Sequence, residues 1–64
     1  MALTTEEKEQ VIEFLDKMDR QQVERILSSL ESFADWLNKA FKWIFKKLAE
    51  WELYHLFEQI MDIF

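Results

Sequence analysis

One pair of residues has the spacing of metal ligands. Glu52 and His55 form a Glu-x-x-His sequence, which di-iron four-helix bundles use to bind metal from one helix face. Those bundles point the ligands into the core, whereas a helical wheel places this pair on the polar face, together with Glu58 and Asp62. The chain also has no second Glu-x-x-His. We therefore interpret the pair as part of a solvated helix face and expect no metal site and no cofactor.

The remaining polar side chains do not make up a catalytic set. The chain has one histidine, no cysteine and no glycine for a phosphate-binding loop. Its hydroxyl groups are confined to Thr4, Thr5, Ser28, Ser29, Ser32 and Tyr54. A nucleophile, a base and oxyanion donors cannot all be drawn from these residues. The sequence predicts that the protein is not an enzyme, and a metal-binding helical bundle is the least favoured function.

Aromatic and basic residues gather in one segment. No acidic residue occurs between Trp36 and Ala49, where lysines alternate with apolar side chains. Tryptophan is the residue type most enriched at the energetic centres of protein interfaces. We predict a partner-binding patch made of Trp36, Lys39, Trp43 and Lys47. The competing interpretation is that these tryptophans pack in the core or in a homodimer.

The same segment, residues 36–51, allows a second function. Interfacial membrane binders combine aromatic anchors with lysines on an amphipathic helix. A net charge of −5 opposes binding to anionic lipid, and charges interrupt every window of the ~20 residues needed to span a bilayer. A peripheral membrane protein is therefore the alternative to a protein-binding module.

Net charge and the first residues of the sequence limit partners and location. Binding to nucleic acid depends mainly on lysine and arginine, so a net charge of −5 argues against a nucleic-acid partner. The sequence begins Met-Ala-Leu-Thr-Thr-Glu-Glu, which is acidic where a secretory signal is basic. We expect a soluble, cytoplasmic protein.

The apolar residues change sides along the chain. On a helical wheel, those in residues 23–51 keep to one side, and those in residues 53–64 occupy the opposite side. A continuous helix cannot bury both sets against one core, so we expect a turn near residues 49–52. Thr4 and Glu7 have capping-box spacing, which predicts that a helix starts there. Between Met18 and Val23 the apolar stripe of the helical wheel shifts to another side, which predicts a turn. Asp19 and Gln22 repeat the capping-box spacing at this turn.

These signals predict an all-α fold of three helices, at about residues 5–18, 20–49 and 52–63. The central helix is expected to be long and flanked by the two shorter, antiparallel helices, in a single domain spanning residues 1–64. Ser28 and Glu31 also have capping-box spacing, which allows a new helix to start there. Because the apolar stripe holds its phase through residues 28–32, we prefer one continuous helix.

The width of the apolar arc suggests a partner. Between Phe33 and Trp51 the apolar residues cover about 200°, whereas a helix packed on one layer needs only ~100°. A chain of 64 residues also buries little surface by itself. We therefore predict self-association into a helical bundle. The favoured function is a noncatalytic protein–protein interaction module, such as a homo-oligomeric adaptor, an assembly factor or a small inhibitor.

Overall fold

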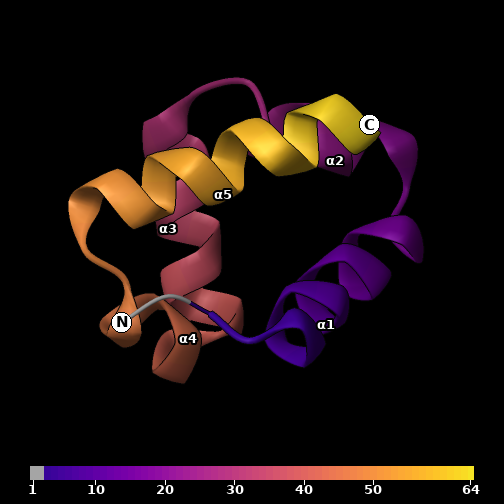
Figure 1. Cartoon of the computed structure of the whole chain (residues 1–64). Helices are drawn as coiled ribbons and strands as arrows, with labels where there is room; N and C mark the ends of the chain where they lie inside the picture. The colour runs from indigo at the N-terminus through magenta and orange to yellow at the C-terminus, as the bar shows by residue number, and fades with distance from the viewer. Residues whose placement is uncertain (1–2) are drawn as a thin grey trace.

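The chain is all-helical in the computed structural model, which describes residues 3–64. The described residues form five helices: α1 (Thr5–Asp16), α2 (Arg20–Ile26), α3 (Leu30–Ala40), α4 (Lys42–Lys47) and α5 (Glu50–Ile63) (Figure 1). No strand occurs among the described residues. The all-α prediction is confirmed. The predicted arrangement of three helices with a long central one is wrong, because residues 20–49 form three separate helices.

The start of α1 follows from its capping residues. The Glu7 N–H donates to Thr4 Oγ1 at 3.2 Å, and the Thr4 N–H donates to Glu7 Oε1 at 3.0 Å. The predicted capping box is therefore confirmed, and it satisfies two N–H groups that the helix itself leaves unpaired. The turn predicted after Met18 is also present. The capping spacing of Asp19 is not used there, since its side chain makes no capping hydrogen bond.

The first break in the predicted central helix occurs at two serines, Ser28 and Ser29. The Ser32 N–H donates to Ser29 Oγ at 3.1 Å, with Ser29 in an extended conformation. One turn earlier, the Ser28 hydroxyl donates to the Arg25 carbonyl at 2.7 Å. Serine competes in this way with the helical hydrogen bonds of the backbone. A new helix does start in this region, but its cap is Ser29, one residue after the Ser28 cap that we considered.

The second break lies at Phe41 and spans a single residue. Phe41 has φ −135° and ψ 60°, so α3 stops before it and α4 starts directly after it. Its ring packs on Phe14 of α1, with 5.5 Å between ring centroids. The bend also allows Ile44 of α4 to be fully buried. Packing on both sides of the bend compensates for the interrupted helix.

The third break confirms the turn predicted near residues 49–52, although it comes slightly earlier. Leu48 and Ala49 are extended, and α5 begins at Glu50. The Ala49 N–H donates to Glu52 Oε1 at 3.0 Å. Alanine has no side-chain acceptor, so only this half of a capping box is present. After the turn, the apolar face of α5 can reach the core.

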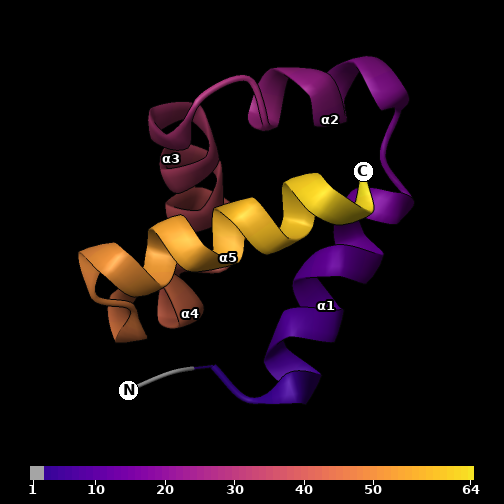
Figure 2. The ribbon, with the colours of Figure 1, turned by 45° about the horizontal axis from the view of Figure 1, so that its top comes forward.

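Helix α3 occupies the middle of the fold. It packs against α2, α4 and α5, and it crosses α5 in both views (Figures 1 and 2). Phe33 and Leu37 are fully buried, and the Phe33 ring meets Phe57 of α5 at 5.5 Å. The buried apolar residues of the core are Leu3, Val11, Leu15, Val23, Ile26, Phe33, Leu37, Ile44, Leu56, Phe57 and Ile60. They come from all five helices and the segment before α1.

Replacing the cap of α3 tests the first break. We expect Ser29→Ala to destabilise the protein by about 1 kcal/mol, because the Ser32 N–H loses its acceptor. For a chain of this size that lowers Tm by about 4–8 °C. A continuous helix predicts the opposite sign, since alanine favours a helix interior more than serine does. Thermal unfolding followed by circular dichroism measures the change. Asn38→Gln, an exposed substitution away from the first turn of the same helix, is the control.

Candidate functional site

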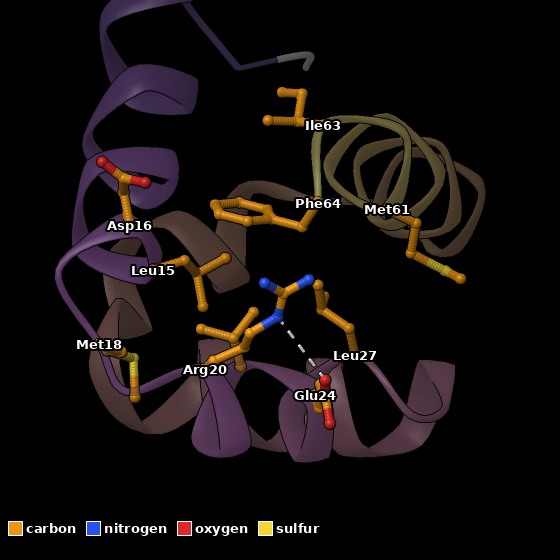
Figure 3. Close-up of a pocket in the computed structure, with 10 residues that line it drawn as sticks. Leu15, Asp16, Met18, Arg20, Glu24, Leu27, Met61, Ile63 and Phe64 are labelled. Carbon is orange, nitrogen blue, oxygen red and sulfur yellow. Dashed lines mark ion pairs between the residues drawn. The ribbon is translucent and has the colours of Figure 1, made fainter.

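Three helices border an open hollow of about 600 Å³ (Figure 3). The end of α1, α2 and the last turn of α5 form its walls. Its lining residues are Leu15, Asp16, Met18, Arg20, Val23, Glu24, Leu27, Met61, Ile63 and Phe64. We call this hollow the α1/α2/α5 groove. Its volume falls within the range of natural ligand-binding pockets.

Large apolar side chains on the α5 side of the groove are exposed. The exposed fractions are 48% for Met61, 58% for Ile63 and 45% for Phe64. Leu15 and Val23, by contrast, are buried at the other walls. Neighbouring exposed apolar side chains around a hollow are typical of a binding surface. The sulfur-containing side chain of Met61 can also adapt its shape to what it contacts.

The charged side chains of the groove come from α1 and α2. Arg20 Nε lies 3.9 Å from Glu24 Oε1, one helical turn along α2. Both side chains are mostly exposed, so their ion pair contributes little to stability. Asp16 is exposed at the end of α1. In Figure 3 the Arg20 guanidinium extends from α2 toward Phe64.

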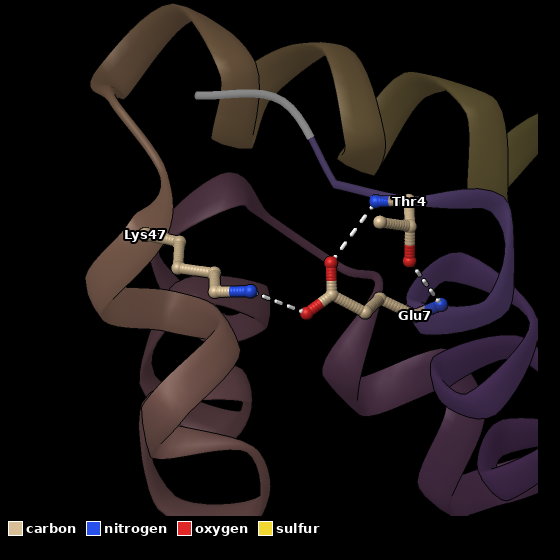
Figure 4. A network of polar contacts seen from close by, with 3 residues as sticks. All are labelled: Thr4, Glu7 and Lys47. Carbon is tan, nitrogen blue, oxygen red and sulfur yellow. Dashed lines mark hydrogen bonds and ion pairs between the residues drawn. The ribbon is translucent and has the colours of Figure 1, made fainter.

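A second cluster joins α4 to the start of α1 (Figure 4). Lys47 Nζ lies 2.7 Å from Glu7 Oε2 and 5.6 Å from the centroid of the Trp43 ring. The other carboxylate oxygen of Glu7 accepts the Thr4 N–H. Hydrogen bonding from Lys47, then from the Thr4 backbone, lowers the pKa of Glu7 below its ordinary value of 4.5. Glu7 therefore stays ionised and fastens α4 to α1.

The structure divides the four predicted partner-binding residues. Trp43 and Lys47 lie together on α4, and half of the Trp43 side chain is exposed. Trp36 is half-buried on α3, where its ring packs on Phe33 at 6.0 Å. Lys39 pairs with Asp35 on the exposed side of α3, at 3.1 Å. Trp36 thus packs against the core, while about half of the Trp43 side chain is exposed.

The two residues of the Glu-x-x-His pair lie in different surroundings. Glu52 is buried, and its carboxylate accepts the Ala49 N–H. His55 is exposed. Within residues 3–64, no group of three histidine, cysteine, aspartate or glutamate residues is arranged to hold a metal ion. Chemically, Glu52 acts here as a helix cap.

Sequence reasoning missed the groove. It assigned Met18, Leu27, Ile63 and Phe64 to buried helix faces, and it did not single out Met61. On a helical wheel these residues cannot be told from core residues. These residues line a surface only because α1 ends beside α2 and because α5 crosses the fold so that its last turn lies near both helices. No sequence signal identified the site.

Comparisons with known proteins add nothing to this geometry: no family model, no curated protein and no solved structure matches the chain. Among the described residues, no helix is both long and apolar enough to cross a membrane.

The ion pair of Glu7 makes a testable contribution to stability. Since its pKa is lowered on folding, the contribution is present above about pH 4.5 and is lost as pH falls through the folded-state pKa. Wild-type Tm should therefore fall more between about pH 5 and pH 3 than that of Glu7→Gln. Thermal unfolding across this range measures the difference. Glu6→Gln is the control, and a Glu6→Gln curve that matches Glu7→Gln would refute the assignment.

The two tryptophans should differ in what they contribute to folding. Trp36→Ala removes ring contacts to Phe14, Phe33 and Phe41, and we expect it to destabilise the protein by about 2 kcal/mol or more. Trp43→Ala removes the cation–π contact with Lys47, worth about 0.5–1 kcal/mol at an exposed site, and the packing of a side chain that is 51% exposed, so we expect a smaller loss. Urea unfolding compares them. Equal losses of stability would contradict the division between core and surface.

Proposed function

We propose that this chain is a noncatalytic, cytoplasmic protein-binding module whose α1/α2/α5 groove receives the apolar face of a helix from a partner. The observation that carries the proposal is the hollow of about 600 Å³ beside three exposed apolar residues: Met61 and Ile63 of α5, and Phe64, which follows it. Amphipathic helices bind to such grooves through apolar side chains spaced one turn apart. An adaptor, an assembly factor and a small inhibitor all use this mode of binding.

The chemistry of the groove favours a protein partner over a small substrate. Its lining contains no histidine, cysteine, serine or threonine, so it offers no ordinary nucleophile or base beyond the carboxylates. Asp16 and Glu24 are exposed and do not converge with a nucleophile. Two methionines, Met18 and Met61, provide the adaptable apolar surface that helix-binding proteins use. Binding rather than catalysis suits this set of side chains.

The alternative, a peripheral membrane protein, uses residues 36–51 as one amphipathic helix. Those residues belong to three helices, α3, α4 and the start of α5. Ile44, which lies on the apolar face that would have to insert into the membrane, is fully buried in the core. An interfacial helix needs a whole apolar face to insert. The groove therefore supports protein binding better than the segment supports membrane binding.

A charge placed in the groove tests the proposed function. A library of helical peptides displayed on phage is selected on immobilised wild-type protein, and the affinity of a selected peptide is measured by fluorescence anisotropy. We expect Met61→Lys to raise Kd by about tenfold or more, because losing one buried apolar side chain removes about 1.5–3 kcal/mol.

Tyr54→Lys is the matched control. Tyr54 lies on the same helix as Met61 and is equally half-exposed, at 51% against 48%, but it does not line the groove. Its substitution should change Kd less than about twofold. Selected peptides whose affinity is the same for Met61→Lys and wild type would overturn the proposal.

A further inference from the structure

Helix α4 is a basic, aromatic projection. It carries three lysines and no acidic residue in the sequence Lys-Trp-Ile-Phe-Lys-Lys. Ile44 anchors it in the core, whereas Trp43 is 51% exposed. Lys42 and Lys46 are exposed on the same helix. Tryptophan is the residue type most enriched at the energetic centres of protein interfaces.

The charge of the α1/α2/α5 groove is opposite in sign to that of α4. Two carboxylates, Asp16 and Glu24, and one guanidinium, Arg20, line it. Helix α5 ends at the groove with no basic residue in its last turn, whereas Lys17 follows the last residue of α1 directly. The C-terminal end of a helix carries partial negative charge. Because Arg20 pairs with only one of the two carboxylates, the lining keeps a net negative charge that favours a cationic partner, and the Arg20 guanidinium can stack on an incoming aromatic ring.

The two surfaces lie at opposite ends of the molecule. In both views, α4 lies near the start of α5, whereas α2 lies near the end of α5 (Figures 1 and 2). Ile44 and the Glu7–Lys47 ion pair hold α4 in its place. A copy of the chain therefore cannot insert its own α4 into its own groove. Only the α4 of a second copy can do so.

We propose that the groove binds α4 of a second copy of this chain, with Trp43 entering the hollow and Lys42 and Lys46 facing Asp16 and Glu24. This inference rests on the proposed function, since it names the occupant of the same groove. Each copy uses one surface as donor and the other as acceptor, so the contact is head-to-tail. Such a contact joins copies into open chains or closed rings.

Light scattering on a wild-type dilution series is the first measurement. We expect the mass to rise with concentration beyond that of a dimer, and to fall in high salt because the contact joins opposite charges. Trp43→Ala should weaken association by about tenfold or more. Trp51→Ala is the matched control, since Trp51 is 70% exposed and belongs to neither surface.

Mixing two defective variants separates this contact from a symmetric one. Trp43→Ala lacks the donor surface and Met61→Lys lacks the acceptor surface, so each should be monomeric alone. Their equimolar mixture retains one intact donor and one intact acceptor, and should form a dimer that grows no further. Lys46→Glu serves as a second donor variant, with circular dichroism confirming that each variant is folded.

Four results would overturn the inference. A wild-type dimer that keeps its mass after Trp43→Ala would place self-association elsewhere. A mixture that stays monomeric would exclude the donor–acceptor contact. A monomeric wild type whose groove still binds a selected peptide would remove the second copy as occupant but leave the protein-binding function. Failure of both self-association and peptide binding would refute both proposals.

Discussion

The burial of Phe33 is the contact on which the rest of the structure depends. Its side chain is fully buried and its ring touches Phe57 of α5 and Trp36 of its own helix. Through Trp36 the ring contacts continue to Phe14 of α1. A chain of 64 residues without cysteine has no covalent cross-link to support a small core. Aromatic packing around α3 therefore holds α1, α3 and α5 together.

The turns between the helices bring their apolar faces into that core. A straight helix over residues 20–49 would spread its wide apolar arc around more than one side. Bends at Ser29, Phe41 and Ala49 instead turn α3, α4 and α5 toward a shared interior. Much of the apolar excess that suggested a second copy is therefore used within the chain. Apolar surface remains exposed chiefly on α4 and on α5.

The functional surfaces follow from where these helices end. Helices α1 and α5 finish beside α2 and leave the α1/α2/α5 groove between them. At the other end of the molecule, Lys47 binds Glu7 and fixes α4 so that Trp43 points outward. Stability and recognition thus share residues. The ion pair that attaches α4 to α1 also presents the surface that we assign to a partner.

The sequence by itself determined the helical class, the capping box at Thr4 and the turns near Met18 and Ala49, because each depends on neighbouring residues. It did not determine the breaks at Ser29 and Phe41, which a wheel cannot detect when the apolar stripe keeps its phase. Nor did it separate half-buried Trp36 from exposed Trp43, or identify the groove. Only the tertiary structure decided these points, because packing between distant helices selects which apolar side chains are covered.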